Sequence, residues 1–312
     1  MESGFGWLAK TNILARKTIA FFEAMGEPRD QSDGLPFMPN LKMQGKRVLV
    51  TGSGTGLGRE IALEFARQGA DVVLHYSSSP ADSAKKEIEQ LGRKVRVVQA
   101  DLSDLGQTLK LAEEALQAFG GLDCLVNNSG ICLNRPFLEN TPAEFEKLYH
   151  VNVRAQFFLT QKFAAHIVGR KGEGTVCNIA SIHGLSGAPE HAIYAGTKGA
   201  IIAQTRTIAI ELAHRGVRVN AIAPGWVTVE SYPKSLPGFN EEEAKKVAAE
   251  KIPLGRSGFK FEIGKLAVFL CSEDSGFIVG QTLVADGGTT SLMSLISDFR
   301  TRSSAQFGRH YL

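Results

Sequence analysis

The fold is decided by residues 48–58, which read VLVTGSGTGLG. The apolar run Val48–Val50 predicts a short buried strand, and Leu57, Ile61 and Phe65 follow it at helical spacing. A strand, a tight glycine turn and a helix start together suit the pyrophosphate of a dinucleotide. Glycines let the backbone approach the phosphates, and the free amides of the first helical turn favour negative charge. The stretch therefore predicts a dinucleotide-binding strand–turn–helix unit.

Short β-branched runs alternate with helical patterns through most of the chain. The strand candidates are Arg47–Thr51, Val72–His75, Val95–Ala100, Cys124–Val126, Thr175–Ala180, Val217–Ile222 and Thr282–Ala285. Helical spacing of apolar residues marks Leu109–Phe119, Phe157–Ile167 and Ile201–Leu212. Apolar strands separated by helices imply a parallel sheet covered on both faces, with right-handed crossovers. We therefore predict an α/β fold, a doubly wound, Rossmann-like parallel sheet of about seven strands in one domain, residues 45–290.

A tyrosine and a lysine four residues apart form the most informative chemical pair. Tyr194 and Lys198 stand one helical turn apart in AIYAGTKGA, residues 192–200, so a helix would bring both side chains to one face. An ammonium group beside a phenol favours the phenolate and moves its pKa toward neutral pH. Ser181 lies upstream in NIASIHG, residues 178–184, and adds a hydroxyl. The three residues together predict proton transfer at a carbonyl or alcohol.

These elements in this order resemble the short-chain dehydrogenase/reductase family over about residues 45–290. The matching segments are TGSGTGLG at 51–58, DLSD at 101–104, NNSG at 127–130, VNV at 151–153, Ser181, Tyr194 with Lys198, AIAPGWV at 221–227 and ADGG at 285–288. The glycine spacing is the TGxxxGxG variant rather than GxGxxG. Ser129 stands where the family usually has alanine, which we expect to tune cofactor binding without abolishing it.

The resemblance implies specific roles for individual residues. The catalytic set would be Asn152, Ser181, Tyr194 and Lys198, with Asn152 at a helix start holding a water that joins Lys198 to solvent. Cofactor contacts would come from Gly52, Thr55, Gly56, Leu57, Gly58, Tyr76, Ser77, Ser78, Asp101, Leu102, Asn128, Gly130, Tyr194, Lys198, Pro224 and Gly225. Asn127 would have a structural role. His183, His191 and Trp226 lie near these motifs in the sequence and are candidates to line the substrate pocket.

The preference between NAD and NADP depends on the end of the second predicted strand. An acidic residue there binds the ribose hydroxyls and repels a 2′-phosphate. The chain reads VVLHYSSSP, with Tyr76 near the position of that acid and Ser77 and Ser78 after it. The basic residue common in phosphate-binding members is also missing, because Thr55 occupies its place. We expect NADP(H) to be favoured over NAD(H), with dual use open.

Three segments depart from the regular alternation. Residues 227–251 contain Pro233, Pro237 and a charged run, Asn240–Lys251, and are predicted to form a substrate lid; a solvated surface helix is the alternative. Residues 1–44 form an N-terminal extension, partly helical. We expect its helix to pack on the core or on a neighbouring subunit rather than on a membrane. Residues 291–312 form a C-terminal tail.

Composition excludes several classes of protein. The 312 residues include 35 basic and 32 acidic residues, a balance that does not favour nucleic-acid binding. No apolar run approaches the roughly 20 residues that cross a bilayer. The four cysteines, Cys124, Cys132, Cys177 and Cys271, show no metal-ligand spacing and suggest a reducing compartment. We expect a cytoplasmic protein without a metal site, and the resemblance implies a homo-oligomer, a tetramer.

Two substrate classes and one class without chemistry remain open. The leading prediction is an NAD(P)-dependent oxidoreductase that interconverts a carbonyl and a secondary alcohol or sugar hemiacetal. The segments SIHG and QTLVADGG are similar to those of bacterial sugar dehydrogenases of the glucose 1-dehydrogenase type, but 3-oxoacyl and general ketone reductases share them. A catalytically silent cofactor-binding scaffold is the third possibility. The intact Ser181, Tyr194 and Lys198 argue against it.

Overall fold

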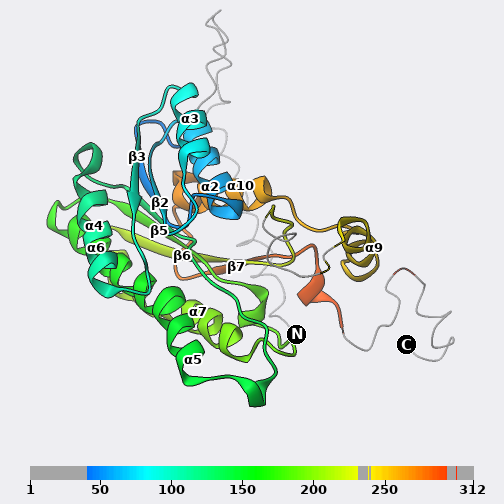
Figure 1. The fold of residues 1–312 in the computed structure, drawn as a ribbon. Coiled ribbons are helices and arrows are strands. Elements are labelled where there is room, and N and C mark those ends of the chain that lie inside the picture. The colour runs from blue at the N-terminus through cyan, green and yellow to red at the C-terminus, as the bar shows by residue number, and fades with distance from the viewer. Residues whose placement is uncertain (1–40, 231–237, 239, 294–299, 301–312) are drawn as a thin grey trace, which may run out of the picture. The chain divides into compact units, whose positions relative to one another are not determined.

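Seven parallel strands form one sheet in the computed structural model, which describes residues 41–230, 238, 240–293 and 300. The strands are β1 (Arg47–Val50), β2 (Asp71–Tyr76), β3 (Val95–Gln99), β4 (Cys124–Asn127), β5 (Gly174–Ile179), β6 (Val217–Pro224) and β7 (Thr282–Ala285). Their order is β3-β2-β1-β4-β5-β6-β7 (Figure 1). The chain reverses direction across the sheet between β1 and β4, and such a switch point opens a crevice at the carboxyl ends of the strands.

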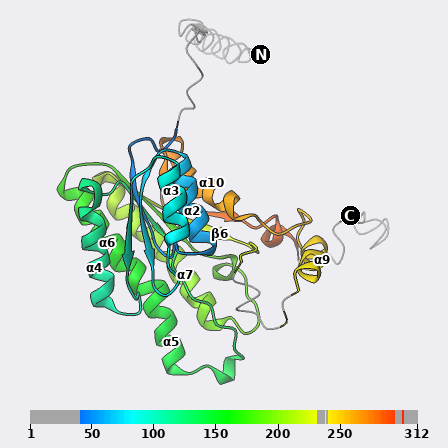
Figure 2. The ribbon, with the colours of Figure 1, turned by 45° about the horizontal axis from the view of Figure 1, so that its top comes forward.

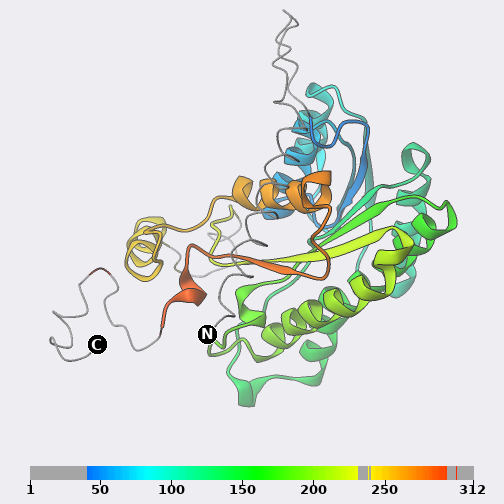
Figure 3. The ribbon, with the colours of Figure 1, turned by 180° about the vertical axis from the view of Figure 1, so that it is seen from behind.

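Helices cover both faces of this sheet. One face carries α2 (Gly56–Arg67), α3 (Asp82–Gln90) and α10 (Lys260–Cys271); the other carries α4 (Leu105–Gln117), α6 (Ala155–Gly169) and α7 (Ala192–Leu212). Figures 2 and 3 show these two layers from different sides. Two more helices, α5 (Pro142–Tyr149) and α9 (Glu241–Lys251), complete the described set. The predicted doubly wound α/β fold is confirmed.

The core follows the alternation of side chains along the strands. Val48 and Val50 of β1 are fully buried against the α2 and α10 side, whereas Leu49 packs on the α4 and α6 side. Burial on both faces explains why these strands read as continuous apolar runs. Several predicted boundaries shift: the helical segment predicted as Leu109–Phe119 is α4, which begins at Leu105 and ends at Gln117, because Phe119 has a φ of +53°, which a right-handed helix cannot accommodate.

The predicted lid is described only in part. Its helix, α9, begins where Asn240 accepts hydrogen bonds from the Glu242 and Glu243 amides. The strand end that leads into the segment is tied down by a bridge between Val227 and Gly258. Residues 231–237 and 239 lie outside the described residues, as do residues 1–40 of the predicted N-terminal extension and all but 291–293 and 300 of the C-terminal tail.

The four cysteines are all free thiols. Cys124, Cys177 and Cys271 are buried in the α2 and α10 side of the core, and burial raises the pKa of the Cys177 thiol. Cys132 is exposed. None of the helices in the described part of the chain is long and apolar enough to span a bilayer.

Candidate active site

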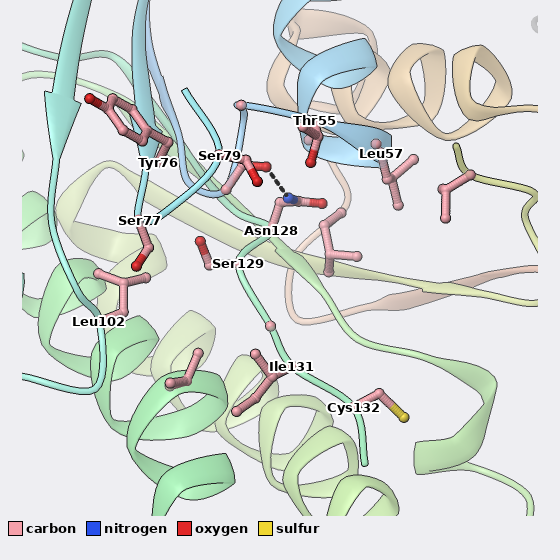
Figure 4. Close-up of a pocket in the computed structure, with 18 of the residues that line it drawn as sticks. Thr55, Leu57, Tyr76, Ser77, Ser79, Leu102, Asn128, Ser129, Ile131 and Cys132 are labelled. Atoms are coloured by element: carbon pink, nitrogen blue, oxygen red, sulfur yellow. Dashed lines mark hydrogen bonds between the residues drawn. The ribbon is translucent and has the colours of Figure 1, made fainter. Parts of the chain in front are cut away.

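A cleft of about 780 Å³ opens at the carboxyl ends of the strands. Figure 4 shows its lining, with Tyr76 and Ser77 at one end, Thr55 and Leu57 along one wall, and Cys132 at the other end. All the residues proposed for the cofactor line it, and so does Ser181. Three further candidates, His183, His191 and Trp226, do not, and neither does Asn152.

The glycine turn is held in place by the neighbouring strand end. Thr51 Oγ1 accepts hydrogen bonds from the Asn128 and Ser129 amides, both at 3.0 Å. Asn128 Nδ2 donates to the Thr51 carbonyl at 2.9 Å. A Cβ at Gly58 would lie 2.2 Å from the Gly52 carbonyl oxygen, so only glycine lets α2 start this close to the turn. The result is an open cradle at a helix N-terminus, which fits a pyrophosphate.

Hydroxyl groups dominate the end of the cleft beside β2. Tyr76 is half-buried, and its hydroxyl donates to Gln99 Oε1 at 3.4 Å; Ser77 and Ser78 are exposed. Asp101 is the one carboxylate among the described lining residues, and it accepts hydrogen bonds from the Ser103 amide and hydroxyl at 2.8 Å. No arginine lines this part of the described cleft. The end therefore offers neutral donors without a fixed charge at the β2 terminus.

Ser181, Tyr194 and Lys198 converge at the other end. Ser181 follows β5 and caps a short 3₁₀ turn, accepting from the His183 amide at 3.2 Å. Tyr194 and Lys198 lie one turn apart at the start of α7, and Lys198 Nζ is 5.5 Å from the centre of the Tyr194 ring. Lys198 is 4% exposed and donates to the Ile179 carbonyl at 2.8 Å. Burial lowers the pKa of Lys198 to about 8.

Asn152 lies beside this group without reaching the cleft. Its Oδ1 accepts from the Ile131 amide at 2.8 Å, and its Nδ2 donates to the Ile131 carbonyl at 2.9 Å and to Thr197 Oγ1 at 3.1 Å. The predicted position at a helix start was wrong. Asn152 lies in a π-helical turn, His150–Arg154, that joins α5 to α6, a distortion typical of functional sites. Its fully buried amide ties the loop after β4 to α7.

The two histidines lie beside Tyr194 and are not part of the cleft lining. The His183 and His191 rings are 4.4 Å apart, and their centres lie 5.6 and 6.3 Å from that of Tyr194. Burial, reinforced by His191, lowers the pKa of His183. Trp226 is half-buried, and its carbonyl accepts from the Gly258 amide at 2.9 Å. None of the three lines the described cleft, and their place in a substrate pocket stays a prediction.

Several lining residues were missed from the sequence. They are Gly54, Ser79, Ser103, Ile131, Cys132, Lys147, Val151, Ile179, Ala180, Val227 and Val229. Most adjoin a motif residue, and that adjacency was the available signal. Val229 and Lys147 lie away from the strand-end motifs, so only the path of the chain reveals them. Within the described residues, no group of three or more His, Cys, Asp or Glu side chains could hold a metal ion.

Comparisons with known proteins agree with this geometry. A family model described as enoyl-(acyl carrier protein) reductase matches residues 52–290. The hydroxynaphthalene reductase-like protein Arp2 of Metarhizium majus is 38% identical over 259 residues, covering 80% of this chain and 96% of the relative. A candidate short-chain alcohol dehydrogenase from Sinorhizobium meliloti is 31% identical, with a TM-score of 0.76 over 82% of this chain and 100% of that one. A candidate 2-deoxy-D-gluconate 3-dehydrogenase from Agrobacterium tumefaciens, solved with bound NADP, is 31% identical, with a TM-score of 0.73 over the same shares.

Proposed function

The chain belongs to the short-chain dehydrogenase/reductase family and is an NAD(P)-dependent oxidoreductase of carbonyls and alcohols, and from this premise we propose that Tyr194 is its acid–base residue. One observation carries the proposal: Ser181, Tyr194 and Lys198 line the same cleft as the glycine turn. The cradle left open by Gly58 and the cleft's volume fit a nicotinamide dinucleotide. When bound, that cofactor supplies or accepts the hydride.

The chain's own residues handle the proton and the reacting oxygen. Tyr194 donates its phenolic proton to the carbonyl oxygen in reduction and takes it back in oxidation. Ser181 donates a hydrogen bond to the same oxygen and stabilises the negative charge that develops there. The Lys198 ammonium, held near the tyrosine ring by its bond to the Ile179 carbonyl, favours the phenolate. Asn152 would support proton exchange by fixing the loop that borders Lys198.

The cofactor preference is proposed to be NADP(H), with NAD(H) accepted more weakly. A 2′-phosphate would approach the end of β2, where Tyr76, Ser77 and Ser78 line the cleft and no carboxylate stands among them. Hydroxyls donate to phosphate oxygens without the repulsion that an aspartate or glutamate would impose. The NADP bound to the Agrobacterium tumefaciens relative supports the same choice.

The substrate is proposed to be a ketone on a largely apolar ring system. The lining of the cleft includes Ile131, Cys132 and Val227, whose side chains offer few hydrogen bonds to a polyhydroxylated sugar. The name of the Metarhizium majus relative, a hydroxynaphthalene reductase-like protein, agrees with such a substrate. A sugar or sugar acid is the second candidate, favoured by the structural similarity to the Agrobacterium tumefaciens protein.

The protein is further proposed to form a homotetramer and to be located in the cytoplasm. Phe157 on α6 and Ile210 on α7 are large apolar residues that are 37% and 76% exposed. A homotetramer in which α6 and α7 pair between subunits would cover them. Four free thiols suit a reducing cytoplasm. Light scattering of the purified protein tests the assembly, and a monomeric mass would refute it.

The decisive experiment is a substrate panel with a matched pair of tyrosine variants. Naphthols and their keto tautomers, cyclic ketones, acyl thioesters and sugars are each tested with both cofactors, following the absorbance of reduced nicotinamide. Tyr194→Phe should lower kcat by roughly 10²- to 10⁴-fold, the usual range for an acid–base group, with unchanged cofactor affinity. Tyr149→Phe, a hydroxyl on α5 outside the cleft lining, should retain activity. Equal activity of the two variants would refute the role of Tyr194, and cofactor binding without turnover would favour a silent scaffold.

A further inference from the structure

A buried imidazole lies directly beneath the glycine turn. His75 is on β2, which lies between β1 and β3 in the sheet. It is 1% exposed and borders the cleft. Its Nδ1 accepts a hydrogen bond from the Gly52 amide at 3.0 Å, and its Nε2 lies 3.1 Å from the Ala100 carbonyl oxygen. One ring therefore links the loops that follow β1 and β3.

The two contacts fix the protonation state of the ring. The Gly52 amide can only donate, so Nδ1 must be the unprotonated nitrogen and Nε2 must carry the hydrogen that goes to the Ala100 carbonyl. A protonated imidazolium would present two donors and lose the bond to Gly52. Burial lowers the pKa of His75, which keeps the ring neutral. The ring thus acts as an acceptor toward the turn and as a donor toward the adenosine end.

The backbone of the same residue is bound to the turn independently of its ring. The Ser53 amide donates to the His75 carbonyl at 2.8 Å, and the His75 amide donates to Ser53 Oγ at 2.9 Å. These bonds do not involve the side chain of His75, so His75→Leu and His75→Gln leave their donors and acceptors in place. The imidazole adds one thing to them: it engages the amide of Gly52, whose φ of +65° has to be maintained for the turn to keep its shape.

We propose that His75 is a positioning residue that holds the phosphate-binding turn in the conformation required for the dinucleotide. The Gly52 amide donates to the ring and the Ser53 amide donates to the His75 carbonyl, so both amides anchor the turn and phosphate binding falls to the amides that follow them. The ring's second bond fixes Ala100, which directly precedes Asp101 and Leu102 at the adenosine end of the cleft. This inference rests on the proposed binding of NADP(H) in the cleft.

Three variants separate positioning from simple stability. His75→Leu keeps an apolar side chain of similar size and removes both ring bonds. His75→Gln restores one acceptor and one donor on a single amide. Val73→Ala is the matched control, because Val73 is fully buried two residues earlier on the same strand, where its side chain packs in the core on the α4 and α6 side. Each protein is assayed for NADPH Kd by nicotinamide fluorescence, for kcat and KM, and for thermal stability.

The expected result is a split between binding and turnover. His75→Leu should raise the Kd and KM for NADPH about 10-fold or more, as expected for loss of a buried hydrogen-bond partner, and change kcat at saturating cofactor less than about three-fold. His75→Gln should recover most of the affinity. Val73→Ala should lower stability and leave the Kd unchanged.

Different failures identify different errors. A wild-type Kd in His75→Leu, or a Kd in His75→Gln as weak as in His75→Leu, would refute the role of the ring while leaving the proposed function intact. A comparable loss of affinity in Val73→Ala would show that general destabilisation is the cause, and would also refute it. Absence of dinucleotide binding by the wild-type protein would overturn the proposed cofactor site together with this role.

Discussion

Replacing Lys198 by methionine is expected to stabilise the cofactor-free protein while abolishing turnover. The lysine is 4% exposed at the base of the cleft, where it donates to the Ile179 carbonyl at 2.8 Å and lies 5.5 Å from the centre of the Tyr194 ring. Burial lowers the pKa of its amine from 10.5 to about 8, which means that the folded protein holds the ammonium form at a free-energy penalty. Methionine has a similar length and no charge, so it removes that penalty.

The size of the expected stabilisation follows from the shift in the pKa of Lys198. A fall from 10.5 to about 8 corresponds to about 3 kcal/mol at roughly 1.4 kcal/mol per pKa unit. Loss of the hydrogen bond to the Ile179 carbonyl destabilises the variant by about 1 kcal/mol. The free energy of unfolding of Lys198→Met should therefore exceed that of the wild-type protein by about 2 kcal/mol near pH 7.

The advantage of the methionine variant should shrink as the pH rises. Between about pH 8 and pH 10.5 the unfolded chain keeps the proton on Lys198 while the folded chain has lost it. The unfolded state then binds more protons, so the wild-type protein gains stability with increasing pH. Near pH 9.5 the remaining penalty is about 1 kcal/mol, which the hydrogen bond offsets, and the two proteins should be almost equally stable.

Urea unfolding followed by circular dichroism at pH 7 and pH 9.5 measures both quantities. Lys110→Met is the control, because the Lys110 side chain is 76% exposed and its pairing with Glu114, at 4.0 Å, is worth little. The control should change stability by less than about 0.5 kcal/mol at either pH. A Lys198→Met protein less stable than wild type at pH 7, or an advantage that does not shrink at pH 9.5, would refute the reasoning.

Three further predictions concern the turn, the cofactor and the base of the sheet. Gly58→Ala should abolish cofactor binding, because its Cβ would lie 2.2 Å from the Gly52 carbonyl oxygen. Gly169→Ala, whose Cβ would meet no atom within 4 Å, should bind the cofactor normally. Calorimetry with NADPH compares the two variants. Tyr76→Asp should raise the Kd for NADPH at least about 10-fold and spare NADH, whereas Tyr76→Phe should spare both; equal losses for the two cofactors would contradict the proposed phosphate position. Burial raises the pKa of Asp123, but hydrogen bonds from Arg47 and Arg170 outweigh it and lower the pKa to about 2. Asp123→Asn should therefore lower the unfolding free energy by about 2 kcal/mol at pH 7, and the difference should vanish as the pH falls from 4 to 2; a difference that persists at pH 2 would exclude this linkage.

Local patterns were sufficient for the first unit of the fold. Residues 48–58 predicted β1, the turn and the start of α2, because a strand period, positive-φ glycines and a helical period all lie within one short stretch. The order of the seven strands is a different matter. The pairing of β1 with β4 joins segments far apart in the sequence, and the number of strands and their crossovers came from alternation and family resemblance rather than from local chemistry.

The site was predictable where a motif ends a strand and less so where a loop folds back. The glycines, Ser181, Tyr194 and Lys198 line the cleft because strand ends and the first turn of α7 have fixed positions. His183 and His191 were expected in the substrate pocket; their rings lie beside Tyr194 but outside the described cleft lining, so that expectation stays a prediction. Their placement depends on the path of residues 182–191, which spacing does not specify.

The π-helical turn at Asn152 is a further feature that spacing does not reveal. The segment HVNVR continues the helical pattern of its neighbours. Its distortion is accompanied by bonds from Asn152 to Ile131 and Thr197, which belong to a different loop and a different helix. A prediction from local periodicity therefore sees an ordinary helix, because the partners that select the wider turn are supplied by the tertiary fold.

The positions of the thiols allow chemical labelling to report whether a dinucleotide occupies the cleft. All four cysteines lie within the described residues; three are buried in the core, and Cys132 is exposed at one end of the cleft (Figure 4), near enough to Lys198 for its charge to act on the thiol. Burial raises the pKa of Cys132, so alkylation should be slow and faster in mild alkali. A maleimide dye would then mark a single position, and a dinucleotide in the cleft would shield it. The labelled fraction in a crude extract would measure how much of the enzyme stands empty.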